Sequence, residues 1–214
     1  MDSRYKYLIK NTGILTISSF STKILTFLMV PLYTSVLTTE EYGTYDLAVS
    51  TVSLLIPILS VNIVDGVMRY SMDSRYDRAD IFSIGLRRIS VAAFIFAAIL
   101  AANSVFHITN VFAGEELLIL LYFISTLLYS LLTQFAKGCE AVKQMAIAGI
   151  ISTVCLVGTN ILLLLVFELG VTGFFIASCA SQLIPAIYLA VRLEIWSYTH
   201  LKISKKIQAE VLKY

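Results

Sequence analysis

The sequence has few charged residues, few cysteines and few histidines, and these absences exclude most kinds of soluble protein. Charged residues make up 14% of the 214 residues, whereas a soluble domain carries roughly a quarter. Three cysteines and two histidines occur without metal-type spacing, so we expect neither a disulfide framework nor a metal site. No acid pair, nucleophile–base set or phosphate-binding glycine loop is recognisable, so no enzyme chemistry and no cofactor are expected. A net charge of +2 gives no indication of nucleic acid binding.

What the sequence does contain is apolar: 58% of its residues are hydrophobic. They gather in six segments, each close to the ~20 residues that a helix needs to cross a bilayer. Runs of this length are too long for barrel strands, and a membrane-spanning backbone must satisfy its own hydrogen bonds. The sequence therefore predicts an all-α integral membrane protein, a six-helix bundle. The predicted helices cover about 12–37, 42–64, 89–106, 117–135, 146–167 and 171–191.

The charges between these segments predict the orientation. Fifteen of the sixteen lysines and arginines lie before the first segment, in alternate connections, or after the last segment. The other connections are short and carry glutamates at Glu40, Glu41, Glu115, Glu116 and Glu168. Basic residues stay on the cytoplasmic side of a membrane, so we expect both termini in the cytoplasm.

The sixteenth basic residue, Lys23, lies in the middle of the first segment. A charge at that depth costs about 2.5 kcal/mol or more, and either end of the segment is roughly 18 Å away, too far for the side chain to reach easily. Two interpretations stay open: a residue that faces a water-filled cavity, or a structural lysine held by an ion pair or hydrogen bonds. Helical spacing places four hydroxyl residues on the same stripe. They are Thr12, Thr16, Ser19 and Thr26.

Other segments carry polar stripes at helical spacing. Serines at such positions either line a cavity or allow close helix packing, and the pattern does not decide between the two. The members are Asp46, Ser50, Ser53, Pro57 and Ser60 in the second segment; Thr126, Ser130, Thr133 and Lys137 in the fourth; Gly149, Thr153 and Asn160 in the fifth; and Ser178, Ser181, Gln182 and Pro185 in the sixth.

At the cytoplasmic end of the second segment, Asp65 and Arg69 have the i, i+4 spacing of a helical acid–base pair. They form either a plain interfacial salt bridge or part of a binding site at the mouth of a cavity. Arg87 and Arg88 are expected at the cytoplasmic start of the third helix, where they anchor the orientation. Residues 1–193 are thus predicted to form the membrane bundle. Residues 194–214 are predicted to form a cytoplasmic tail that includes a short basic amphipathic helix.

Two stretches carry a resemblance to a known family. PLYTSVLTTEEYGTYDL (31–47), after NTGILTISSFSTKILTFL (11–28), and DGVMRYSMD (65–73) resemble Wzx-type polysaccharide flippases. These belong to the multidrug/oligosaccharidyl-lipid/polysaccharide exporter superfamily. The layout of all six segments is similar, while the specific residues lie mainly in the first ~75 positions.

The resemblance implies a carrier that moves undecaprenyl-pyrophosphate-linked oligosaccharide between leaflets of the bacterial cytoplasmic membrane by alternating access. It places the cationic cavity residue of the family at Lys23, and we expect Ser19, Thr26, Asp65 and Arg69 to contribute to substrate binding. Family members have two six-helix lobes. The sequence covers one, so we expect a truncated or partial chain, or two copies that pair. Two alternatives remain: a multidrug extruder lobe of the same superfamily, and an accessory membrane protein without transport activity.

Overall fold

The computed structural model describes residues 13, 27, 29–107, 112 and 114–199, and over these residues the protein is almost entirely helical. Residues 29–36 are helical and end the first predicted segment. Most of the rest of that segment, including Lys23, Ser19 and Thr26, lies outside the described residues, as does the tail from residue 200. The elements that follow are α2 (Thr39–Ser60), α3 (Ile63–Met72), α4 (Arg78–Phe106), α5 (Glu116–Gly138), α6 (Val142–Asn160), the π-helix η1 (Ile161–Val166), α7 (Gly170–Arg192) and the 3₁₀-helix η2 (Ile195–Tyr198).

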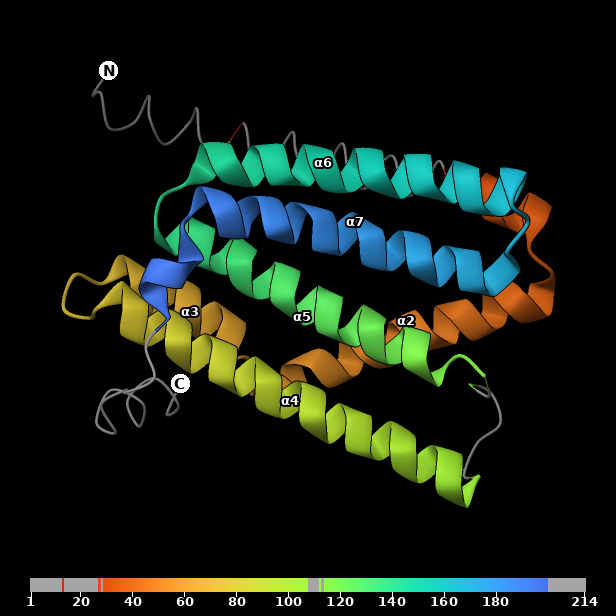
Figure 1. The fold of residues 1–214 in the computed structure, drawn as a ribbon, viewed down its shortest axis with the longest axis horizontal. Coiled ribbons are helices and arrows are strands. Elements are labelled where there is room, and N and C mark those ends of the chain that lie inside the picture. The colour runs from red at the N-terminus through yellow and green to blue at the C-terminus, as the bar shows by residue number, and fades with distance from the viewer. Residues whose placement is uncertain (1–12, 14–26, 28, 108–111, 113, 200–214) are drawn as a thin grey trace.

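Five of the described helices are long and apolar enough to cross a membrane, with α6 and η1 together forming one of them. The predicted all-α membrane fold is confirmed. In Figure 1, α7 lies beside α6 and α5, and the short α3 packs against α4 and α5. Helix α6 has two buried residues, Ala148 and Asn160, while most of its other residues are half-buried.

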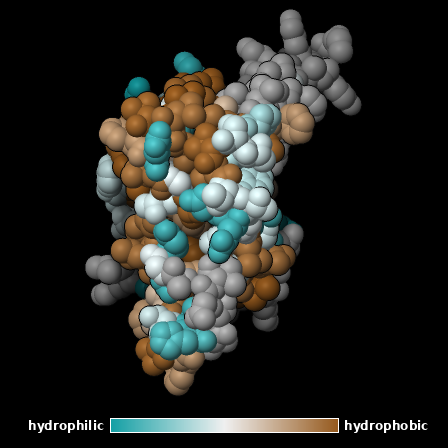
Figure 2. Space-filling view, turned by 90° about the vertical axis from the view of Figure 1, so that its right-hand side faces the viewer, coloured by the Kyte–Doolittle hydropathy of each residue, from teal (hydrophilic) through white to brown (hydrophobic). Residues whose placement is uncertain are grey.

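The two ends of the bundle differ in charge. One end, which we call the basic end, holds α3, the α3–α4 and α5–α6 connections and η2 (Figure 1). The other, the acidic end, holds the start of α2, the α4–α5 connection and the η1–α7 connection. The glutamates at 40, 41, 115, 116 and 168 all belong to the acidic end. Viewed from there, hydrophilic residues lie across the middle of the end and hydrophobic residues surround them (Figure 2).

The predicted end of the second helix, at about residue 64, is wrong, because α2 ends at Ser60 and the helix breaks there. Val61 and Asn62 are both in the left-handed region, with φ of 52° and 49°. The Asn62 amide donates to the Pro57 carbonyl at 3.0 Å and the Val61 amide to the Ile58 carbonyl at 3.3 Å, a Schellman arrangement that closes α2. Asparagine tolerates this conformation, whereas a β-branched valine is strained in it.

Helix α4 begins at Arg78, eleven residues before the predicted start at 89. The Asp77 side chain accepts a hydrogen bond from the Ala79 amide at 2.9 Å and caps the helix. Arg87 and Arg88 therefore lie inside α4 rather than at its start. With 29 residues, α4 is about 43 Å long and exceeds the hydrocarbon thickness of a bilayer, so its first turns belong to the basic end beyond the membrane.

Two glycines allow α3 to pack closely. A Cβ on Gly138 would lie 2.5 Å from the Ser71 Cβ and 2.9 Å from the Met68 carbonyl oxygen. A Cβ on Gly85 would lie 2.7 Å from methyl groups of both Leu131 and Val67. Gly138 of α5 therefore lets α3 approach α5 closely, and Gly85 of α4 lets α4 approach both α3 and α5. Small residues allow this kind of close packing at helix interfaces in membranes.

The buried apolar residues form two separate clusters. The large cluster extends through α2–α7 and includes Phe135, whose ring lies 4.7 Å from Phe82 and 5.2 Å from Tyr198, centroid to centroid. The Tyr198 carbonyl also accepts a hydrogen bond from the Ser83 hydroxyl at 3.1 Å, so η2 folds back onto α4 and α5. The small cluster, at the acidic end, consists of Tyr33, Leu37, Leu164 and Phe174.

Candidate functional site

A cavity of about 380 Å³, lined by polar and apolar side chains together, lies at the basic end, between α2, α3 and α5. Its volume is in the range of small-molecule sites, roughly 300–1,000 Å³. The break between α2 and α3 shapes one wall, and the last turns of α5 form the other. We call it the basic-end cavity. Its lining residues are Ile56, Pro57, Ser60, Asn62, Val64, Asp65, Tyr129, Ser130, Thr133, Gln134 and Lys137.

Asp65 joins the two walls. Its Oδ1 accepts a hydrogen bond from Gln134 Nε2 at 2.6 Å, and its Oδ2 accepts one from Asn62 Nδ2 at 3.0 Å. Carboxylate bonds of this kind are stronger than those between neutral groups. The carboxylate is exposed, so it is anchored in position while it stays accessible from the cavity.

Several other polar atoms in this wall have unused hydrogen-bonding capacity. Ser60 Oγ and Gln134 Oε1 are buried and have no hydrogen-bond partner in the described part of the chain. The Thr133 hydroxyl donates to the Tyr129 carbonyl at 2.7 Å, so toward a ligand its oxygen can only accept. Native proteins leave few buried polar atoms unpaired, so two of them beside one cavity mark a place for a polar ligand or water.

The predicted polar stripes meet here only in part. Pro57 and Ser60 from the second segment and Ser130, Thr133 and Lys137 from the fourth line the same cavity. Asp46, Ser50 and Ser53 are instead exposed along α2 and line neither of the two cavities described here. The stripe of α7 is packed inside the bundle, where Ser178, Ser181 and Pro185 are buried.

Asn160, from the stripe of the fifth segment, is fully buried where α6 passes into η1. Its amide nitrogen donates to the Tyr33 hydroxyl at 3.1 Å and to the Leu156 carbonyl at 2.8 Å. Asn160 thereby links the end of the first helix to η1. Single-turn π segments inside helices often occur at functional sites, but here the residue serves helix–helix contact.

Gln134 is a site residue that the sequence interpretation missed. It lies 69 positions from Asp65, a separation that no local pattern reveals. A signal was present, because Ser130, Gln134 and Lys137 follow one another at helical spacing on α5. Arg69, predicted as the helical partner of Asp65, lies one turn along α3, exposed and outside the lining of the cavity.

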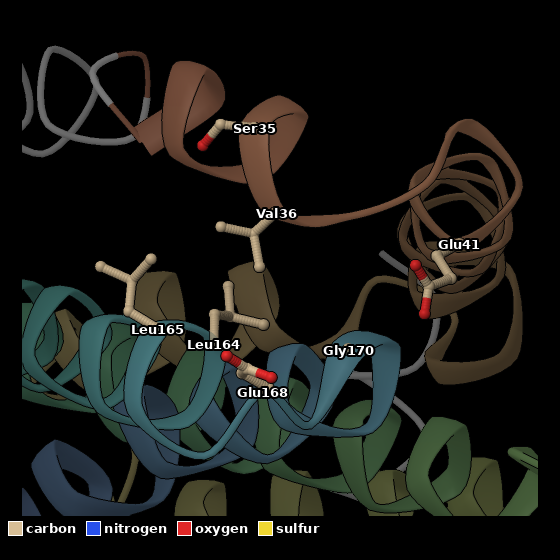
Figure 3. A pocket seen from close by; sticks show the side chains of 7 residues that line it. All are labelled: Ser35, Val36, Glu41, Leu164, Leu165, Glu168 and Gly170. Atoms are coloured by element: carbon tan, nitrogen blue, oxygen red, sulfur yellow. The ribbon is translucent and has the colours of Figure 1, made fainter.

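A second cavity, about 420 Å³ in volume, lies at the acidic end between residues 35–36, α2, η1 and α7 (Figure 3). Its charged lining residues are Glu41 and Glu168. The Glu41 carboxylate caps α2 by accepting hydrogen bonds from the Thr38 amide and hydroxyl at 2.8 and 2.9 Å. Gly170 leaves room for it: φ is +55°, and a Cβ there would lie 2.7 Å from Glu41 Oε1. Two carboxylates, with no lysine or arginine among the described lining residues, make this cavity unfavourable for an anion.

The connection between α3 and α4 is ordered by an exposed ion pair at the basic end. Arg75 NH2 lies 2.6 Å from Asp73 Oδ2, and the Arg75 side-chain and amide hydrogen bonds lower the pKa of the Asp73 carboxyl to about 2. Because this pKa is depressed, the interaction is complete above the ordinary pKa of an aspartate and is lost only as the pH falls toward 2. As an exposed pair it positions the loop more than it stabilises the fold.

The described residues contain no group of three or more histidine, cysteine, aspartate or glutamate side chains that could hold a metal ion. Fold and cavity together define the class: a multi-pass α-helical membrane protein with a cavity at the basic end that brings polar side chains of α2, α3 and α5 together.

Residues 8–214 match the family model described as polysaccharide biosynthesis protein. The chain therefore belongs to the polysaccharide biosynthesis protein family, and the predicted resemblance to exporters of the flippase type is confirmed. No curated protein and no solved structure matches the chain. The family is one of transporters rather than a class of enzymes.

Proposed function

We propose that the protein moves an undecaprenyl-pyrophosphate-linked oligosaccharide from the inner to the outer leaflet of the bacterial cytoplasmic membrane. The observation that carries the proposal is the basic-end cavity, in a chain of the polysaccharide biosynthesis protein family. A lipid-linked glycan has a polar head that cannot cross hydrocarbon unaided, because each unpaired polar group costs several kcal/mol there. The polar side chains in the lining of the cavity replace part of the lost water.

The basic residues of this carrier bind the pyrophosphate at different depths of the membrane. Lys137 lines the basic-end cavity in the last turn of α5 and offers an ammonium group to the pyrophosphate as it enters. Arg69 lies at the mouth, one turn beyond Asp65. Lys23 is the cation that accompanies the phosphates at mid-membrane, and Ser19 and Thr26 offer hydroxyls to the glycan; all three lie outside the described residues.

The exposed polar face of α2 supports a second lobe as partner. Asp46, Ser50 and Ser53 are exposed there, and ionisable side chains in a membrane face a water-filled cavity or a partner rather than lipid. The opposite wall of the transport path is therefore a second six-helix lobe, from the same polypeptide or from a second copy. Residues from 194 onward form the cytoplasmic segment that follows this lobe.

Lys23 provides the direct test of transport. In a strain that depends on this protein for surface polysaccharide, Lys23→Ala is expected to lower surface polysaccharide at least about tenfold, since the anion loses its mid-membrane partner. Surface polysaccharide is measured by gel and antibody, and membrane protein by immunoblot. Lys143→Ala, which removes an exposed lysine at the start of α6, is the matched control and should export normally. Normal export by the Lys23 variant contradicts the proposed role of the lysine.

The orientation has its own test. In a cysteine-free background, Glu40→Cys at the acidic end is expected to react with a membrane-impermeant maleimide in intact cells. Ser74→Cys at the basic end should react only after permeabilisation. Both positions are exposed, so a difference in their reaction with the maleimide reports the side of the membrane on which each one lies. Labelling of Ser74→Cys in intact cells would reverse the orientation that the basic residues predict.

One observation favours a second candidate, extrusion of cationic drugs: a carboxylate, Asp65, borders the basic-end cavity. Lys137 lines the same cavity and repels a cation, which is why the lipid-linked anion is preferred. Drug susceptibility of a deletion strain separates the two, because an extruder raises resistance and a glycan carrier changes only surface polysaccharide.

A further inference from the structure

One wall of the basic-end cavity offers hydrogen-bond acceptors more than donors. Gln134 donates a hydrogen bond from its amide nitrogen to Asp65, and its side-chain oxygen is buried without a partner among the described residues. The Thr133 hydroxyl has given its hydrogen to the Tyr129 carbonyl. Asp65, when ionised, can only accept. These three groups come from two helices, α3 and α5, so the arrangement is a product of the fold.

Ser60 adds an independent indication that a ligand binds at this wall. Its side chain is 1% exposed, it lines the cavity, and its hydroxyl has no partner in the described part of the chain. Leaving a buried hydroxyl unpaired costs on the order of 1–3 kcal/mol. A ligand that hydrogen-bonds Ser60 and the acceptors beside it removes that penalty.

The chemistry of the wall selects among possible ligands. A pyrophosphate is an acceptor and an anion, so Lys137 attracts it, whereas Asp65 repels it and the Gln134 oxygen offers it no donor. A cation suits the acceptors but is opposed by Lys137 in the same cavity. A neutral sugar meets both requirements, because its hydroxyl and amide hydrogens can be donated without bringing a charge. The Tyr129 ring in the lining adds an apolar surface for the ring of the sugar.

We infer that Ser60, Asp65, Thr133 and Gln134 form a glycan subsite that binds an uncharged sugar of the lipid-linked substrate through its hydroxyl groups. The subsite is distinct from the cations that hold the phosphates, and it disfavours an acidic sugar at this position through Asp65. The inference rests on the proposed function, and deepens it by assigning a recognition role to this wall.

The test compares two lipids that differ only in the sugar. Full-length protein in nanodiscs is titrated with undecaprenyl pyrophosphate and with undecaprenyl pyrophosphate carrying one N-acetylated hexosamine. We expect the wild type to prefer the glycosylated lipid, and Gln134→Leu to reduce its affinity for that lipid about tenfold while its affinity for the bare lipid is unchanged.

A matched pair of threonines guards against folding effects. Thr133→Val removes a hydroxyl that lines the cavity and donates to the Tyr129 carbonyl at 2.7 Å. Thr126→Val removes a hydroxyl two turns earlier on the same helix. That hydroxyl donates to the Tyr122 carbonyl, also at 2.7 Å, but does not line the cavity. We expect only Thr133→Val to weaken binding of the glycosylated lipid. Each variant is accepted when its SDS-unfolding midpoint equals that of the wild type.

The possible outcomes are distinct. Loss of affinity for the glycosylated lipid alone supports the glycan subsite. Equal loss for both lipids, equal effects of the two threonine variants, or no preference of the wild type for the sugar overturns the subsite and leaves transport standing. Failure of the wild type to bind either lipid overturns the proposed function, and the subsite with it.

Discussion

Replacing Gly138 by alanine is expected to lower the free energy of unfolding of the protein by about 2 kcal/mol. The new Cβ would lie 2.5 Å from the Ser71 Cβ and 2.9 Å from the Met68 carbonyl oxygen, closer than packed atoms come. One of these atoms belongs to the backbone, so the clash cannot be relieved by a side-chain rotation, and α3 must move away from α5. The stability is measured by SDS titration of the purified protein in mixed micelles.

The same substitution elsewhere in the bundle provides the control. Gly158 lies in α6, and a Cβ there would meet nothing within 4 Å. Alanine is preferred to glycine inside a helix by up to about 1 kcal/mol, so Gly158→Ala should leave stability unchanged or raise it. Opposite signs for one chemical change would show that the effect at Gly138 comes from contact with α3. A Gly138→Ala protein as stable as the wild type would show that α3 does not pack on α5 in this way.

Replacing Phe135 by alanine is expected to lower the free energy of unfolding by about 3 kcal/mol and to release η2 from the bundle. Phe135 is fully buried and contacts Phe82 of α4 and Tyr198 of η2. In a membrane the alternative to burial is lipid rather than water, so the loss comes mainly from packing and from the cavity that remains. SDS titration measures the loss of stability, and faster proteolysis near Tyr198 reports the release of η2.

Phe94 is the matched control for this prediction. It lies in α4, and 77% of its side chain is exposed, so alanine there removes little packing and should change stability by less than about 0.5 kcal/mol. Equal effects at both positions would indicate that apolar character of the helices, and not the contact between α4, α5 and η2, determines stability.

The sequence predicts the membrane helices of this protein well where hydropathy alone decides. The predicted 117–135 and 171–191 differ from α5 and α7 by one to three residues at each end. The start of α4 is missed because Arg78, Asp80, Arg87 and Arg88 interrupt the apolar pattern that marks a span. Their charges lie on a helix that continues past the membrane, where hydropathy no longer reports helical structure.

The break between α2 and α3 could not be predicted for a different reason. It occurs in an apolar stretch around Val61, a residue type that seldom adopts a positive φ. The cause is tertiary, since α3 must turn to pack its close-fitting face against Gly85 and Gly138. For the same reason, the basic-end cavity could be predicted only in part. Asp65 was recognisable from its place at the end of a span, whereas its hydrogen bond with Gln134 exists only once α3 has packed on α5.

The two apolar clusters described above have unequal consequences for motion. Within the described part of the chain, residues 29–37 contact the bundle at the acidic end through a small group of side chains around Tyr33 and through the bond between the Asn160 amide and the Tyr33 hydroxyl. The large cluster extends through α2–α7 and meets the small one at Tyr45, whose ring centroid lies 3.6 Å from that of Phe174 and 5.5 Å from that of Phe175. Among the described residues, moving 29–37 away from the bundle would therefore break the contacts of the small cluster, while most residues of the large cluster lie outside it. A carrier that exposes its cargo to one side of the membrane at a time needs an element that can move at one end of the bundle without disturbing the other end.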